Sequence, residues 1–427
     1  MFAKLKSLQF ILKGSQFLMK NKLFIATLIS YLGIYITMPV LSAISTKAHM
    51  LPGQIGVMIS LGAIAMLVFA PVWGKLSDKL GRKTVIVAGL MGMGVMFILY
   101  TALFRLSISQ SKTITILVIL LMAVRFLLGI FMTTAPTAAN AYMADISYPE
   151  NRAKDMSSLG LATGLAMVLG PIIGGILSSI GTLYLPFYIS IIMLILFGFI
   201  FITILPKKDQ EKNNSKEIDN IKAALEDKKS FFTFKLFGWL IAGCSIMFAV
   251  VGLQILTSLY LHNDLAQTVT QSAKTASLLF VILGISLMIS QFLQIKLLKW
   301  TAQKMMLFAI PLIIIGLLLI AAADNLVLII LSYIIIGAGS GLRMSSLSAG
   351  ASLSVSQQNQ GAAAGAVAMT QGIAGIVSPL FGSFIYEINI KFPFIFFSIF
   401  AVLTYILFVF SNKENNYLKN KDQGVYR

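Results

Sequence analysis

The stretch GKLSDKLGRKT, residues Gly74 to Thr84, separates two long apolar runs of the sequence. It holds four lysine or arginine residues around a single acid, Asp78. Gly74 and Gly81 allow a chain to leave one helix and enter the next at little steric cost. The pattern therefore predicts two membrane helices joined by a short basic turn.

The composition places the whole chain in a membrane. Of its 427 residues 58% are hydrophobic and 11% are charged, and the mean hydropathy is +0.89. A soluble domain carries about 25% charged residues. The net charge of +18 has a simpler cause than nucleic-acid binding, because Lys and Arg are retained in cytoplasmic loops during insertion. We expect the lipid bilayer as a partner and no nucleic acid.

Apolar runs long enough to cross the bilayer recur along the chain, since a crossing helix needs roughly 20 such residues. We predict an all-α membrane protein with twelve transmembrane helices. They fall near Leu23–Ala43, Gln54–Trp73, Val85–Phe104, Thr115–Tyr142, Met156–Ile180, Tyr184–Leu205, Leu236–Tyr260, Ala276–Ile295, Met305–Ala323, Leu326–Gly350, Gly361–Tyr386 and Phe392–Ser411.

The helices form two groups of six with polar segments around them. The predicted parts are a basic amphipathic N-terminus (1–22) on the inner membrane surface, a first bundle (23–205), a linker (206–235), a second bundle (236–411) and a tail (412–427). Lys and Arg gather in the termini, the linker and every second loop. Both termini and the linker are therefore expected on the cytoplasmic side of the inner membrane.

An internal repeat supports two pseudo-symmetric six-helix bundles. The segment from Asn151 aligns without gaps on the segment from Asn359, and Pro171 then meets Pro379. Helices five and eleven thus occupy equivalent places in two homologous halves. Many transporters build a central site between such repeats.

The turn GKLSDKLGRK also resembles the signature loop between helices two and three of the major facilitator superfamily, with Lys79 where Arg is usual. The resemblance covers nearly the whole chain and implies the fold of that family. It implies that Asp78 and Arg82, within the motif that includes Gly74 and Gly81, form a latch. Asp145 at the inner end of helix four and the start of helix eleven would complete it. The alternative is a basic hairpin that only fixes topology.

Helix five carries Gly170, Pro171, Gly174 and Gly175 in the segment AMVLGPIIGG. Small residues permit close helix contact, and a proline bends the helix. The ordered set resembles the export motif of the drug:proton antiporter branch, although Ala166 replaces a usual glycine. The resemblance implies efflux, while a tightly packed helix in any bundle is the simpler alternative.

Arg125 in helix four and Arg343 in helix ten are cations inside predicted spans, where a charge is costly unless it faces a wet cavity. Arg125 matches an arginine that the family links to proton transfer. Backbone carbonyls could instead satisfy either arginine, and for Arg343 we favour that interpretation. Further cavity candidates are Tyr31, Tyr35 and, on helix seven, Gln254.

No Asp or Glu lies within a predicted span, and this weakens both proton coupling and a preference for cationic substrates. No metal-binding or Ser/His/Asp pattern is visible, His49 and His262 are expected in outer loops, and Cys244 is alone, so we predict no enzyme and no metal site.

The predicted function is proton-coupled, multidrug-type export of a small amphipathic compound by a monomer without a cofactor. One alternative is export of an organic anion such as a siderophore or metabolite. The other is a transporter-like membrane sensor or scaffold.

Overall fold

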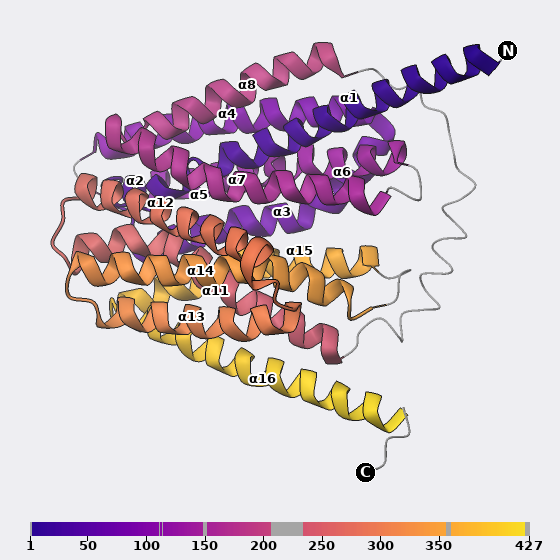
Figure 1. Cartoon of the computed structure of the whole chain (residues 1–427). Helices are drawn as coiled ribbons and strands as arrows, with labels where there is room; N and C mark the ends of the chain where they lie inside the picture. Colours follow the sequence, from indigo (N-terminus) through magenta and orange to yellow (C-terminus); the bar gives the residue numbers. More distant parts are fainter. Residues whose placement is uncertain are drawn as a thin grey trace. The chain divides into compact units, whose positions relative to one another are not determined.

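The structure, a computed structural model, describes residues 2–110, 112, 114–147, 152–205, 234–355 and 360–422. All regular elements in these residues are helices (Figure 1). The first half contains α1 (Phe2–Tyr35), α2 (Met38–Lys47), α3 (Pro52–Leu80), α4 (Arg82–Ile108), α5 (Thr115–Met132), α6 (Thr134–Ile146), α7 (Arg152–Ile180) and α8 (Leu185–Ile204). The second contains α11 (Phe234–Asn263), α12 (Val269–Leu293), the π-helix η1 (Gln294–Leu298), α13 (Ala302–Ala322), α14 (Leu326–Ser352), α15 (Gln360–Ile388) and α16 (Phe392–Asp422).

Twelve spans among the described residues are long and apolar enough to cross a membrane, which confirms the predicted fold class. Two of them are broken. The first span consists of α1 and α2, because a turn at Ile36 and Thr37 precedes Pro39, whose fixed φ suits the first turn of a helix. The fourth consists of α5 and α6, which meet at Thr133. One span was predicted at each of these positions, as observed, but the breaks within them were not predicted.

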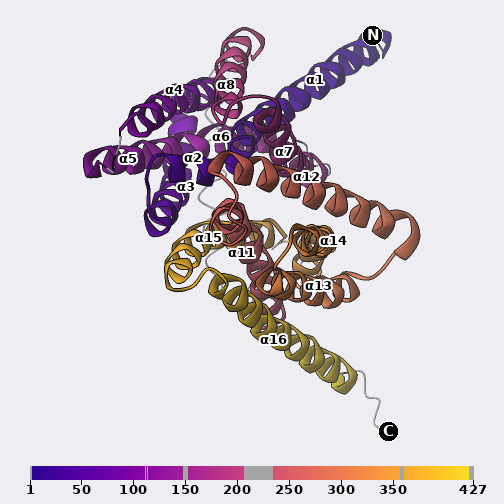
Figure 2. The same cartoon turned by 90° about the vertical axis from the view of Figure 1, so that its left-hand side faces the viewer.

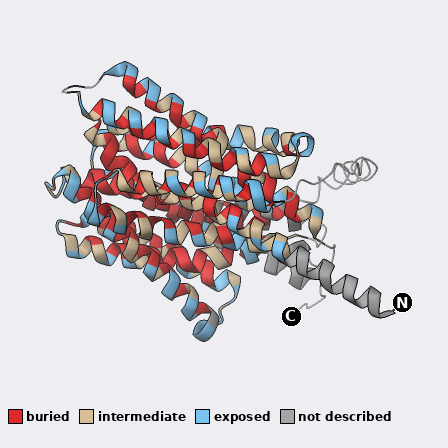
Figure 3. Ribbon diagram, turned by 90° about the horizontal axis from the view of Figure 1, so that it is seen from above, coloured by how far each residue is buried: buried red, intermediate tan, exposed pale blue. Residues whose placement is uncertain are grey.

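The chain forms two compact units. The first comprises Met1–Gln210 and Val269–Ser277, and the second comprises Glu211–Thr268 and Leu278–Arg427. In the first unit α1 packs on α7, α3 on α5 and α4 on α8. In the second unit α13 packs on α14, and α11 packs on α15 and α16 (Figure 2). Buried residues lie on the faces that neighbouring helices turn toward each other (Figure 3).

Several predicted boundaries differ from the observed helices. Residues 2–22 continue into the first span as part of α1 without a break, and α16 continues past Ser411 to Asp422. His262 lies in the last turn of α11 rather than in a loop. Most of the predicted linker, and its suggested surface helix, lies outside the described residues.

The repeat has a counterpart in the backbone. α7 and α15 are each 29 residues long, and each begins one residue after the asparagine at which the sequence alignment starts, Asn151 or Asn359. Pro171 and Pro379 lie inside the two helices at the aligned positions. The two halves therefore place the same kind of proline-containing helix at equivalent points of the chain.

Candidate functional site

A single residue separates the second span from the third. α3 ends at Leu80 and α4 begins at Arg82, so that Gly81 alone is not helical. Its φ of 89° lies in the region that side-chain-bearing residues rarely adopt, so a glycine is favoured there. The predicted basic turn of Gly74 to Thr84 was thus too long, because the charged residues belong to the ends of the two helices.

Arg82 gathers the polar groups at this junction. Its NH2 lies 2.5 Å from Asp78 Oδ1, and its Nε donates a hydrogen bond of 3.1 Å to Asp145 Oδ2 on α6. The predicted set Asp78, Arg82 and Asp145 therefore meets in one cluster. The first unit alone supplies all three side chains.

Ser77 is a member of this cluster that the sequence argument missed. Arg82 NH1 donates to Ser77 Oγ at 2.5 Å, and the buried hydroxyl in turn donates to the carbonyl of Gly74. The side chain of Arg82 is 15% exposed, whereas that of Asp78 is 54% exposed. The arginine is thus held from within the protein while one of its acids remains open to solvent.

The glycines of the α7 motif allow α1 and α7 to approach closely. A Cβ added at Gly170 would overlap Tyr35, and one added at Gly174 would overlap the backbone carbonyl of Ile36. Ile36 is part of the turn that breaks the first span. The motif therefore packs against the α1–α2 break, with Pro171 buried between the two glycines.

Gly175, the last residue of the motif, contacts a different partner. An added Cβ there would lie 2.9 Å from the carbonyl oxygen of Ser277. Ser178, one turn further along α7, shares a hydrogen bond of 2.9 Å with the Ser277 hydroxyl. Val269–Ser277 belong to the first unit, so this contact extends the packing surface of α7 within that unit.

The aromatic candidates also lie beside the motif. The rings of Tyr31 and Tyr35 on α1 stack with centroids 6.3 Å apart, and both residues are half-buried. Gln254 on α11 is half-buried in the second unit.

Arg125 is 2% exposed on α5, and its Nε and NH1 have no hydrogen-bond partner among the described residues. Gly62 on α3 leaves room for the guanidinium, because an added Cβ would lie 3.0 Å from Nε. Tyr100 is near enough to interact electrostatically, and its hydroxyl donates to Met58 Sδ at 3.1 Å. These two nitrogens therefore do not donate to backbone carbonyls of the described residues, contrary to what the alternative interpretation expected.

Arg343 on α14 has similar surroundings in the second unit. It is 4% exposed, Nε and NH2 have no partner among the described residues, and NH1 lies 3.8 Å from Met247 Sδ. Ser340, one turn away, is also buried with an unpartnered hydroxyl. Two nitrogens of Arg343 therefore lack the carbonyl partners that the favoured interpretation expects among the described residues, and each unit buries one such arginine.

Two buried cations without acidic partners favour an anion or a polarised oxygen as ligand. Burying an unpaired charge costs several kcal/mol unless something compensates it. Among the described spans the acids Asp78, Asp145 and Glu387 lie at helix ends. The arginines consequently dominate the electrostatics of the helix interiors.

Lys20 and Asp155 form a further ion pair, which was not predicted from the sequence. Lys20 Nζ lies 2.6 Å from Asp155 Oδ2, and both side chains are largely shielded. The pair joins α1 to the first turn of α7, where an acid also interacts favourably with the helix dipole. The two residues are far apart in sequence, so no local pattern marks them as partners.

Comparison with known proteins identifies the family to which this chain is similar. Residues 23–379 and 299–424 match the model of the Major Facilitator Superfamily. A class H tetracycline resistance protein of Pasteurella multocida is 31% identical over 169 residues, which are 39% of this chain and 39% of that protein. Multidrug resistance protein 1 of Bacillus subtilis is 29% identical over 43% of this chain and 44% of its own length. The aligned regions thus span about two fifths of these relatives.

The likeness to solved structures covers the whole fold. A nucleoside transporter superposes with a TM-score of 0.69, over 92% of this chain and 99% of its own. The sequence identity is 16%, so the match concerns the fold alone.

Proposed function

Because the chain belongs to the major facilitator superfamily, we propose that this membrane transporter exports a small amphipathic compound by alternating access, in exchange for protons. It works as a monomer in the cytoplasmic membrane, with both termini inside. The names of the tetracycline and multidrug resistance relatives support export, although they align with the chain over only part of their length.

The observation that carries the proposal is the packing of α7 on the break between α1 and α2. Gly170 and Gly174 bring the α7 backbone against Tyr35 and Ile36, at the end of α1 where the turn at Ile36 and Thr37 separates it from α2. Closely packed helices can slide or tilt with small changes at such a break. Small residues at this contact fit an element that moves during each transport cycle.

The Arg82 cluster supplies the bistable part of the mechanism. A group of ion pairs that forms in one state and opens in the other biases the equilibrium between them. Asp78 suits this role because it is exposed and can exchange partners. While Asp78 exchanges partners, the contacts with Ser77 and Asp145 hold Arg82 in place.

Reconstituted vesicles test the proposal. We expect efflux of at least one amphipathic compound from a panel of cationic, neutral and anionic members, with a rate that depends on an imposed pH gradient. Vesicles that lack the protein give the background. Flux that ignores the pH gradient would refute proton coupling, and absence of flux across the panel would favour a sensor or scaffold.

Export of an organic anion is the second candidate, and it rests on Arg125 and Arg343. Each arginine is nearly fully buried with two unpartnered nitrogens, and no acid lies near the middle of a described span. A carboxylate substrate would compensate these charges better than a cation. In the same panel this candidate predicts that anionic members are transported fastest.

A further inference from the structure

We propose that the second unit binds a phospholipid with an anionic headgroup in a groove between α12, α13 and α14. The acyl chain lies in the groove and the headgroup contacts Lys296, Lys299 and Lys304 at its end. This site is independent of the substrate that the protein carries.

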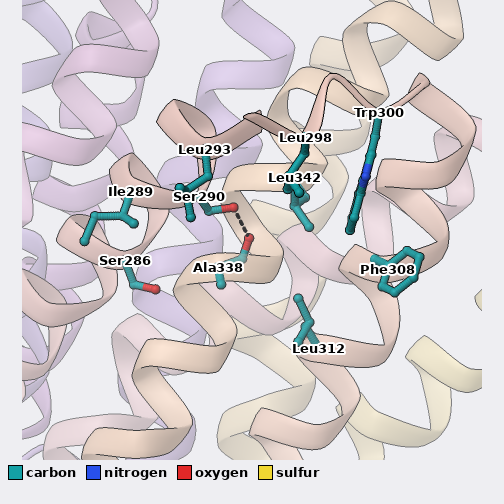
Figure 4. Close-up of a pocket in the computed structure, with 10 residues that line it drawn as sticks. All are labelled: Ser286, Ile289, Ser290, Leu293, Leu298, Trp300, Phe308, Leu312, Ala338 and Leu342. Carbon is teal, nitrogen blue, oxygen red and sulfur yellow. Dashed lines mark hydrogen bonds between the residues drawn. The ribbon is translucent and has the colours of Figure 1, made fainter. Parts of the chain in front are cut away.

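The groove is an apolar cavity of about 190 Å³, several times the roughly 30 Å³ of one water molecule (Figure 4). Its lining is contributed by all three helices and by the turn that follows α12: Ser286, Ile289, Ser290, Leu293, Leu298, Trp300, Phe308, Leu312, Ala338 and Leu342.

The hydroxyl groups of the two serines that line the groove already donate hydrogen bonds to backbone carbonyls. Ser286 donates to the carbonyl of Ile334 at 2.6 Å, and Ser290 donates to the carbonyl of Ala338 at 2.8 Å. Both bonds tie α12 to α14. The distance along α12 from Ser286 to its end is about 10 to 15 Å, comparable to one half of the roughly 30 Å hydrocarbon layer.

The turn at the end of the groove is held in a fixed shape. η1 is a π-helix, a rare form that is frequent at functional sites, and Lys299 after it is left-handed with a φ of 46°. The buried Gln294 side chain donates to the Trp300 carbonyl at 3.0 Å and accepts from the Trp300 amide at 3.4 Å. A non-glycine residue in this conformation persists only where its surroundings over-determine it.

The charges at this turn match an anionic headgroup. Lys296, Lys299 and Lys304 are exposed and form no salt bridge with any described residue. Lys304 Nζ lies 4.8 Å from the centre of the Trp300 ring, which itself packs against Phe308. A Trp beside lysines is typical of the membrane interface, and basic pockets between transmembrane helices bind anionic lipid headgroups. An apolar groove that ends in three lysines without an acidic partner among the described residues therefore favours this lipid over a neutral one.

Quenching of Trp300 fluorescence tests the site directly. The protein is reconstituted in phosphatidylcholine vesicles that contain increasing fractions of brominated phosphatidylglycerol or brominated phosphatidylcholine. Subtracting the signal of the Trp300→Phe variant isolates Trp300 from Trp73 and Trp239. We expect half-maximal quenching at a fraction about tenfold lower for the anionic lipid.

Variants separate the headgroup from the groove. Lys296→Gln combined with Lys299→Asn and Lys304→Gln should abolish the preference, and Asn at 299 tolerates the left-handed backbone. The control Lys274→Gln with Lys391→Gln should retain it. Ala338→Phe, which fills the groove, should reduce quenching by both lipids.

Equal quenching of the wild-type protein by both lipids would overturn the proposal, because it would indicate ordinary boundary lipid. Preserved selectivity in the triple lysine variant would overturn it as well. If that variant does not fold, the wild-type comparison still decides.

Discussion

Arg82 is the residue on which the cluster between α3 and α4 depends, since it contacts Ser77, Asp78 and Asp145. Ion pairs that are open to solvent contribute little to stability, usually below about 1 kcal/mol. Asp78, 54% exposed, belongs to that class. A role in switching, rather than in folding, therefore best accounts for its position.

The Asp78→Asn variant tests this role. We expect it to fold with a free energy of unfolding within about 1 kcal/mol of the wild type. We expect its transport rate to fall about tenfold or more, because weakening the cluster shifts the balance between the two transport states. Thermal unfolding and vesicle transport measure the two effects, and Asp324→Asn, an exposed acid in a loop of the second unit, is the matched control. Unchanged transport would indicate that the charged residues at this junction only fix the topology of the chain in the membrane.

For Arg343 we expect a substitution to increase stability while it reduces transport. Replacing a buried unpaired charge by an apolar side chain of similar length removes a desolvation cost, so Arg343→Met should stabilise the protein by about 1 to 3 kcal/mol. The same change should reduce transport of anionic compounds while sparing neutral ones. Thermal unfolding and the vesicle panel provide the measurements, and Arg343→Lys, which retains the charge, is the control. Destabilisation together with equal losses for every compound would indicate a structural role.

At the scale of elements, the close contact of α1 with α7 is the place where the proposed mechanism requires movement in the first unit. The contact is made by glycines whose missing side chains let the two backbones touch, and Lys20 and Asp155 join the same two helices at the start of α7. A tight contact with an ion pair at its end can act as a pivot.

Alanine substitutions within α7 test this contact. Gly174→Ala would place a methyl group on the carbonyl of Ile36, and we expect a destabilisation of about 1 to 3 kcal/mol together with loss of transport. Gly160→Ala in the same helix is the control, because an added Cβ there has no neighbour within 4 Å. It should be neutral or slightly stabilising, since Ala favours a helix over Gly. Similar behaviour of both variants in thermal unfolding would rule out close packing as the reason for Gly174.

The helices could largely be predicted from hydrophobic run length, because only a helix satisfies its own backbone within a membrane. The breaks within the helical spans were harder to predict from the sequence. The breaks at Thr37 and Thr133 fall inside apolar runs, and the length of the turn at Gly81 depends on a backbone angle that composition does not encode. Charged residues were assigned to a loop there although helices can begin and end with them.

At the scale of the whole molecule, the repeat explains why the second half reproduces features of the first. α7 and α15 share length and an internal proline, and each unit buries one arginine. The family and the candidate residues near Asp78 could be predicted because their motifs are local in sequence. Asp155 and the groove could not, because their partners lie on other helices. Ser77 lies within the local motif, but its role depends on the direction in which the Arg82 side chain points.

Proton-driven export is the central proposal for this protein, and accumulation in inverted membrane vesicles tests it most directly. In such vesicles the cytoplasmic face is outside, so an exporter fills the lumen. With an acidic lumen, vesicles containing the wild-type protein should concentrate at least one amphipathic compound above its external level, and those containing Asp78→Asn should do so at a rate lower by about tenfold or more. Equilibration to equal concentrations on both sides, with or without the pH gradient, would contradict proton-driven export.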